Sequence, residues 1–149
     1  MQRHPTMTLN GTLRLSDNTG RRTAGMFGQL IDDNADVFRR YFGVELFAGS
    51  LNVDVPEPRC LQQDLDAGKP PAAIVIPRTE LINMPTYIGD GQAWRCELTG
   101  DKFPNVINCW IFRRKGSRVP PGVIELVACE LLRTPYELQH GDRVVLAIV

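Results

Sequence analysis

The chain has 149 residues, of which 17 are lysine or arginine and 17 are aspartate or glutamate, so its formal net charge is zero. This excludes a protein held to nucleic acid or to an anionic membrane by net charge alone, although a local basic patch stays open. Apolar residues make up 43% of the chain, which is ordinary for a folded domain and too high for a disordered one. We expect a single domain over residues 1–149, with residues 1–6 as a flexible extension.

The apolar runs of the sequence are short, as at Val144–Val149. None approaches the roughly 20 residues that a helix needs to cross a bilayer, and the first six residues carry no apolar signal core. We therefore expect a cytoplasmic protein with no membrane partner.

The first third of the chain predicts strands around one helix. We expect a strand at Met7–Leu15, a turn at Ser16–Gly20 and a returning strand at Thr23–Ile31. Acidic and amide residues at 32–34 are of the types that cap the N-terminus of a helix, and apolar residues follow at helical spacing until Gly43. This is the one firm helix that the sequence predicts.

The following strand, Leu46–Val55, alternates in polarity. Its apolar side chains share one face, while Ser50, Asn52 and Asp54 share the other. A short helix at Leu61–Ala67 comes next.

The rest of the chain predicts a series of short strands. A Gly-Asp-Gly turn at 89–91 predicts a hairpin between Tyr87–Ile88 and Gln92–Trp94. The further strands and one brief helical turn are expected at Ala72–Ile76, Gln92–Leu98, Val106–Phe112, Val123–Ala128, Glu130–Leu138 (the turn) and Arg143–Val149. Seven to nine strands with one firm helix favour a closed or nearly closed β-barrel.

Common enzyme signatures are absent from the sequence. It contains no GxxxxGK[ST] phosphate loop and no GxGxxG, HExxH or GxSxG motif. The candidate residues below therefore rest on their types and spacing.

Ser50 and Asn52 are candidate magnesium ligands. They lie two apart on a predicted strand, so both side-chain oxygens face the same way. Neutral oxygens suit Mg²⁺ when phosphates supply the negative charge, and Gly49 would permit close backbone approach. A strand with an ordinary polar outer face explains the same pattern.

Glu125 stands inside the apolar strand Val123–Ala128. Its carboxylate points either outward between buried neighbours or into a lined cavity, where its pKa would suit a general base. The basic run Arg113–Arg118 would hold phosphates or form a solvated turn. Arg133 ends a helical turn, where an ordinary surface cation is common.

These motifs, in this order, resemble the archaeal-type CTP-dependent riboflavin kinases. That family has a P-x-x-G-T-L-N strand, an I-I-E-hydrophobic strand, an L-R pair and a closing L-x-x-G-D-x-V. The matching stretches are Phe38–Gly43, Ala48–Val53, Val123–Ala128, Leu132–Arg133 and Leu138–Val144. The resemblance runs from about residue 9 onward, is strongest over the final thirty residues, and carries little specific signal between 56 and 103.

The resemblance implies a six-stranded cradle-loop barrel that transfers the terminal phosphate of CTP to the ribityl hydroxyl of riboflavin, giving FMN. It implies that Ser50 and Asn52 hold Mg²⁺ and that Glu125 handles the substrate hydroxyl. It also implies nucleotide contacts near Gly25 and Gly49.

Two parts of the chain depart from the family pattern. The Gly-rich loop of the family's first hairpin keeps only Gly25, although Arg21 and Arg22 would offer phosphate contacts of their own. After Phe112 the family has proline, a basic residue and threonine, and Ser117 is the closest equivalent here. Ser117 is thus the third implied nucleotide contact, and Arg133 of the L-R pair is the implied substrate contact.

Two other functions stay open. A barrel that lost the Gly-rich loop would bind a flavin, a nucleotide or another small polar ligand without catalysis. A nucleic-acid module is the other, and zero net charge and the absence of a helix-turn-helix pattern weigh against it.

Overall fold

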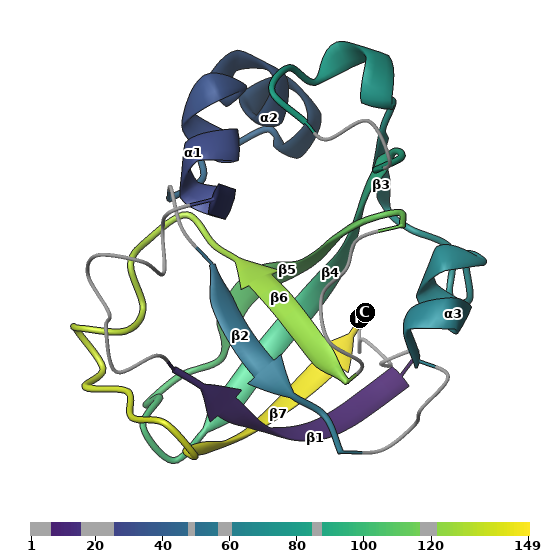
Figure 1. Cartoon of the computed structure of the whole chain (residues 1–149). Coiled ribbons are helices and arrows are strands. Elements are labelled where there is room, and N and C mark those ends of the chain that lie inside the picture. The colour runs from purple at the N-terminus through teal and green to yellow at the C-terminus, as the bar shows by residue number, and fades with distance from the viewer. Residues whose placement is uncertain (1–6, 16–25, 48–49, 57–60, 85–87, 117–121) are drawn as a thin grey trace, which may run out of the picture.

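The computed structural model describes residues 7–15, 26–47, 50–56, 61–84, 88–116 and 122–149 (Figure 1). These residues form seven strands that pair antiparallel throughout: β1 (Met7–Arg14), β2 (Leu51–Asp54), β3 (Ile74–Ile76), β4 (Gly91–Gly100), β5 (Ile107–Arg114), β6 (Val123–Val127) and β7 (Arg143–Ile148). The order across the sheet is β3-β4-β5-β6-β2-β1-β7.

A pairing between β4 and β7 closes six of these strands into a ring. The first residues of β4 pair with β3, whereas the stretch from Cys96 to Gly100 pairs with β7. Strand β5 pairs with the other edge of β4, so β4 is held on both sides. The expected six-stranded barrel is therefore confirmed, with β3 attached outside the ring.

The interior of the ring is filled by the alternate apolar side chains of its strands. Leu13, Val53, Leu98 and Leu146 are fully buried there, and Trp94 is the largest side chain among them. The alternation predicted for the strand around Asn52 is confirmed, since Leu51 and Val53 belong to this core. Their polar neighbours consequently face the outside of the ring.

The other elements are three helices and a 3-10 turn: α1 (Met26–Asp33), α2 (Ala35–Phe42), α3 (Leu61–Asp66) and η1 (Arg78–Glu80). Helices α1 and α2 pack on the outer face of the ring in a second apolar cluster, whereas Leu65 of α3 belongs to the core inside the ring. Phe38 and Phe42 of α2 pack on Phe112 of β5, with ring centroids 5.5 and 6.4 Å apart. The firm helix predicted before Gly43 is confirmed. Gly43 ends it in the left-handed conformation, with its amide donating to the carbonyl of Arg39.

The returning strand predicted at Thr23–Ile31 is wrong, because residues 26–33 form α1. Gly28, Leu30, Ile31 and Asn34 are buried together, which is a helical spacing. In a strand the adjacent pair Leu30 and Ile31 would point to opposite faces. Packing against the second cluster therefore decides the local conformation.

The hairpin predicted at 87–94 is also wrong over the residues described. Gly89 and Asp90 bond to the backbone of Lys115, and Gly91 then opens β4 without a turn. A Cβ atom on Gly91 would lie 2.9 Å from the ring of Phe112. This glycine thus permits close packing onto β5, and it does not mark a reversal of the chain.

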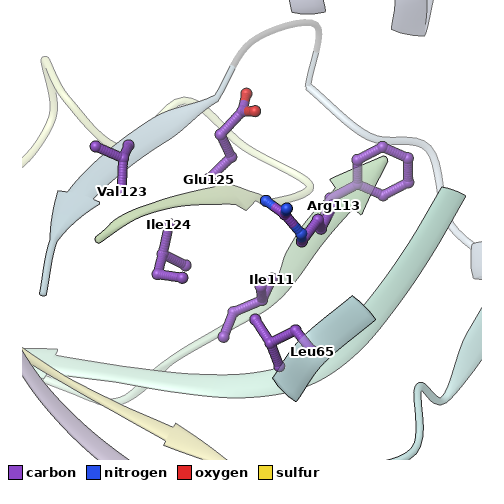
Figure 2. A pocket seen from close by; sticks show the side chains of 7 residues that line it. Leu65, Ile111, Arg113, Val123, Ile124 and Glu125 are labelled. Carbon is purple, nitrogen blue, oxygen red and sulfur yellow. The ribbon is translucent and has the colours of Figure 1, made fainter. Parts of the chain in front are cut away.

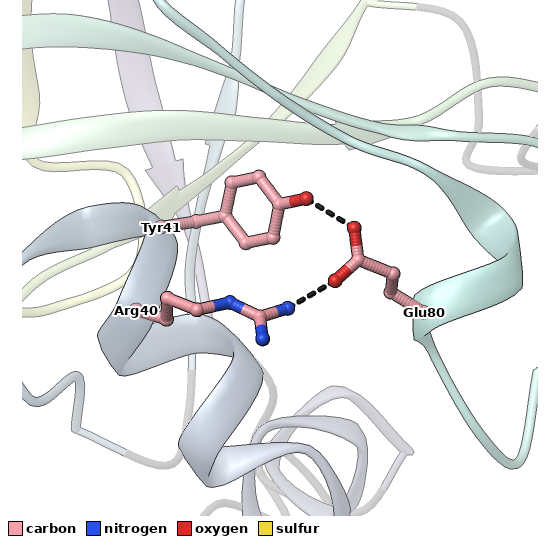
Figure 3. A network of polar contacts seen from close by, with 3 residues as sticks. All are labelled: Arg40, Tyr41 and Glu80. Carbon is pink, nitrogen blue, oxygen red and sulfur yellow. Dashed lines mark hydrogen bonds and ion pairs between the residues drawn. The ribbon is translucent and has the colours of Figure 1, made fainter.

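Polar contacts fix the helices over β4 and β5. Arg40 and Tyr41 of α2 both donate hydrogen bonds to the carboxylate of Glu80 in η1 (Figure 3). At the α1–α2 corner, the buried Asn34 amide donates to the carbonyls of Leu30 and Ile82 and accepts from the amide of Ile82. Within the described ranges, no helix is both long and apolar enough to cross a membrane.

Candidate active site

The antiparallel pairing of β2 with β6 sets Asn52 directly opposite Glu125. Because Leu51 and Val53 on one strand and Ile124 and Leu126 on the other fill the core, both polar side chains point out of the ring. Directly opposed residues on paired strands have Cβ atoms within roughly 5.5 Å of each other. The backbone register therefore creates the site.

The side-chain oxygens of this site are only partly satisfied. The Oδ1 atom of Asn52 is buried and accepts no hydrogen bond. The Ser50 hydroxyl donates to Oε2 of Glu125 over 3.5 Å, a long contact. A buried acceptor without a partner costs stability, and such groups in folded proteins point to a function.

Burial raises the pKa of Glu125 above its ordinary value. The positive charge of Arg114, the hydrogen bond from Ser50 and the charge of Arg113 act in the opposite direction without cancelling it. Desolvation disfavours the charged carboxylate, so Glu125 takes up a proton more readily than a carboxylate in water. This property suits a proton acceptor in catalysis.

A pocket opens beside Glu125 where β5 and β6 part. The two strands pair only at Trp110 with Val127 and at Ile111 with Leu126. Beyond that point a space of about 270 Å³, partly open to solvent, is lined by Leu65, Ile111, Phe112, Arg113, Val123, Ile124 and Glu125 (Figure 2). Much of that volume is open solvent, and the enclosed part has room for little more than one water molecule, so a ligand would lie at the mouth of this hollow and not inside it.

Arg113 of β5 lines this pocket, and the carboxylate of Asp66 in α3 holds its guanidinium in place. Its Nε donates to Oδ1 of Asp66 at 2.6 Å, and its Nη2 donates to Oδ2 at 3.1 Å. Only 11% of the Arg113 side chain is exposed. The first residue of the predicted basic run is therefore an oriented, nearly buried cation, and the solvated-turn interpretation is wrong for it.

The structure thus brings together three of the seven residues singled out from the sequence: Ser50, Asn52 and Glu125. Arg133 lies in the turns at 133–137 between β6 and β7, and its carbonyl accepts from the amide of Leu138. Gly25, Gly49 and Ser117 lie outside the described residues.

Asp66 is the site residue that the sequence reasoning missed. It lies 47 positions from Arg113, at the end of the short helix predicted there, and no local pattern pairs the two. An acidic residue on a predicted helix and a basic run after a predicted strand were the only available signals.

A protein-family model described as "CTP-dep_RFKase: Domain of unknown function DUF120" matches residues 20–148. The chain belongs to the CTP-dependent riboflavin kinase family. The match covers all of β2, β5 and β6, and therefore Ser50, Asn52, Glu125 and Arg113. None of the curated proteins compared with the chain matches it. Membership implies riboflavin and a nucleotide as the ligands of the family, with CTP as its phosphate donor.

Proposed function

We propose that this chain is a riboflavin kinase that transfers the terminal phosphate of CTP to the ribityl hydroxyl of riboflavin, giving FMN and CDP. The observation that carries the proposal is the opposition of Asn52 and Glu125 across β2 and β6. One residue offers an unsatisfied oxygen to a cation and the other a carboxylate with a raised pKa to a proton. Phosphoryl transfer relies on neutralised phosphate charge and a positioned nucleophile, and these two residues would serve both needs side by side.

In this proposal Glu125 accepts the proton of the attacking hydroxyl. The hydroxyl oxygen forms a bond to the γ-phosphorus, and the bond from that phosphorus to the bridging oxygen breaks. CDP leaves with that oxygen, and the proton stays on the Glu125 carboxylate until solvent removes it. Burial of Glu125 favours the proton-bound form, while Ser50 orients the carboxylate.

Asn52 and Ser50 fit a magnesium ion. Oδ1 of Asn52 is a buried neutral acceptor without a partner, and the Ser50 hydroxyl lies on the same outer face of the strand. Mg²⁺ is coordinated by such oxygens together with the phosphate oxygens of a nucleoside triphosphate. When bound, it would neutralise the negative charge of the phosphates. Gly25, Gly49 and Ser117 are proposed to contact the nucleotide, and Arg133 the substrate, on the strength of the resemblance.

A phosphorylation assay tests the proposal. Riboflavin, Mg²⁺ and each of CTP, ATP, GTP and UTP are incubated with the full chain, and FMN is separated from riboflavin. We expect FMN with CTP, and Asn52→Ala should lower its rate at least 100-fold. Asn108→Ala, an exposed asparagine on β5, is the matched control and should leave the rate unchanged.

The other outcomes each count against the proposal. FMN formed only with another triphosphate would show that the donor is not CTP. Flavin or nucleotide binding without FMN would favour the non-catalytic barrel, and full activity of Asn52→Ala would remove this site from the reaction.

A further inference from the structure

The imidazole of His140 holds the end of β1. Its Nδ1 atom accepts a hydrogen bond of 3.0 Å from the backbone amide of Leu15, which lies 125 positions away in the chain. The turn before β7 otherwise bonds to β1 through backbone atoms, as from the amide of Gly141 to the carbonyl of Leu13. The side chain of His140 therefore supplies the next hydrogen bond at the point where the backbone pairing ends.

This hydrogen bond lies one residue from the candidate site. Arg14, which precedes Leu15, is the direct partner of Asn52 in the pairing of β1 with β2. Opposed residues project from the same face of a sheet, so Arg14 and Asn52 stand side by side on the outer face of the ring. The bond to His140 therefore holds the end of β1 against β2, next to the amide that is proposed to bind Mg²⁺.

The bond requires a neutral imidazole with its proton on Nε2. Protonated histidine carries an N–H group on both nitrogens and accepts no hydrogen bond. Histidine changes charge between pH 5 and pH 8, and His140 is exposed, so solvent can deliver the proton. Protonation would turn Nδ1 into a donor that faces the amide of Leu15, and the bond would be lost.

The charged groups on the elements around His140 are Arg14 of β1, Asp54 of β2, Lys102 after β4, Glu137 in the preceding turns, and Asp142 and Arg143 next to it in the chain. Arg14 is paired with Asp54, and Lys102 is paired with Asp142. A backbone hydrogen bond within the turn holds the pKa of Asp142 below its ordinary value, so this carboxylate keeps its charge between pH 5 and pH 8. Among these side chains, histidine is the type that changes charge in that range.

We infer that His140 is a positioning residue for the site beside Asn52: its neutral imidazole fixes the end of β1 there, and protonation of Nδ1 releases it. That role rests on the proposed function, in which this site binds Mg²⁺ and a nucleoside triphosphate. Nucleotide binding should then weaken as the pH falls through the range in which histidine becomes charged. The hydrogen bond does not depend on the proposed function, and it is tested separately.

Hydrogen exchange of the Leu15 amide, measured without ligands, tests the bond. His140→Asn places an amide oxygen where Nδ1 lies, which accepts from Leu15 but does not titrate, whereas His140→Ala removes the acceptor. The protection factor should fall about fivefold from pH 8 to pH 5 in the unaltered chain, hold in His140→Asn, and be low at both pH values in His140→Ala. A protection factor that is equal in all three proteins overturns the inference.

Calorimetry with CTP and Mg²⁺ tests the positioning role. The unaltered chain and His140→Asn should bind CTP equally at pH 8, and at pH 5 the unaltered chain should bind it about fivefold more weakly than His140→Asn. Glu125 and CTP titrate in both experiments, so the difference between the two proteins reports His140 alone. His4→Asn, at the other histidine of the chain, is the control and should bind as the unaltered chain does at both pH values.

Failure of this inference is distinguishable from failure of the proposed function. Equal CTP binding by the unaltered chain and His140→Asn at pH 5 overturns the positioning role, while FMN formation in the kinase assay would still support the proposed function. If the unaltered chain binds no CTP at pH 8, the proposed function falls and the positioning role falls with it, although exchange of the Leu15 amide still decides on the hydrogen bond. Circular dichroism confirms that each variant is folded.

Discussion

Asn52 and Glu125 are direct partners in the antiparallel pairing of β2 with β6, and both project from the outer face of the ring. A strand alternates its side chains with a period of two, so a slip of one residue would turn either group into the core. The buried neighbours Leu51 and Leu126 exclude that slip. The apolar core of the barrel therefore fixes the relative position of these two polar side chains.

Asn52→Ala should leave the stability of the fold intact while activity is lost. The buried Oδ1 atom makes no hydrogen bond, so the folded protein carries a desolvation cost of about 1–3 kcal/mol that alanine removes. We expect the free energy of unfolding in urea, without Mg²⁺, to stay within about 1 kcal/mol of the original or to rise. A fall of more than about 2 kcal/mol would mean that the amide is bonded in the folded state.

Asn34→Ala, in contrast to Asn52→Ala, should lower the free energy of unfolding. Its amide makes three hydrogen bonds, two of them to the backbone of Ile82 and one to Leu30, in a buried position. Removing it leaves two carbonyls and one amide without that partner, at a cost of about 2–4 kcal/mol.

Urea unfolding of Asn34→Ala and of Asn10→Ala gives the comparison, since Asn10 is exposed on β1. We expect Asn10→Ala to lie within about 0.5 kcal/mol of the unaltered chain. Equal stabilities for the two variants would show that the hydrogen bonds between Asn34 and Ile82 contribute nothing to the stability of the fold.

The sequence was sufficient for the barrel and for the shared polar face of Ser50 and Asn52, because the alternation of side chains within one strand is local. It left the direction of the Glu125 side chain open. Ser50 and Asn52 were placed on one face, and they lie there. The conformation of 26–33 was not predictable in the same way, since Leu30 and Ile31 become helical through packing against Phe38 and its neighbours. Local propensity is a weak guide where a distant surface supplies the burial energy.

The pocket could be predicted from the sequence even less well than the helix at 26–33. Its shape depends on where β5 and β6 part, and its charge depends on a contact between Asp66 and Arg113. Both are relations between segments far apart in the chain, which periodicity does not report. The sequence predicted a basic run that would hold phosphates or face solvent, and only the fold distinguishes Arg113 from the rest of that run.

Gly11→Ala should destabilise the ring at the crossing of β1 and β2. A Cβ atom there would lie 2.6 Å from Cγ1 of Val53 and 2.7 Å from the carbonyl oxygen of Asp54. The valine side chain can give way but the backbone carbonyl cannot, so we expect a loss of about 2 kcal/mol in the free energy of unfolding.

The double variant Gly11→Ala, Val53→Ala separates the two clashes. If the carbonyl of Asp54 is the main obstacle, truncating Val53 should rescue none of the loss. A Gly11→Ala protein as stable as the original would show that β1 and β2 lie further apart than the structure has them.

Glu125→Gln should change how stability depends on pH. The pKa of Glu125 is raised by burial, so between its ordinary value of 4.5 and the raised value the folded state binds more protons than the unfolded state. The free energy of unfolding therefore falls as pH rises through this window, and the stabilising effect is fully present only below 4.5. Glutamine does not titrate, so this fall should vanish from Glu125→Gln.

Urea unfolding between pH 3.5 and pH 8 without Mg²⁺, with Glu45→Gln as the exposed control, measures the difference. The same group should govern catalysis, since a protonated Glu125 accepts no proton from the hydroxyl. The rate of FMN formation should then fall on the acid side with a pKa above 4.5, and Glu125→Gln should be slower by about 100-fold or more at every pH. Parallel stability curves for Glu125→Gln and the unaltered chain would contradict the raised pKa, whereas a rate that Glu125→Gln leaves unchanged would contradict the proton transfer alone.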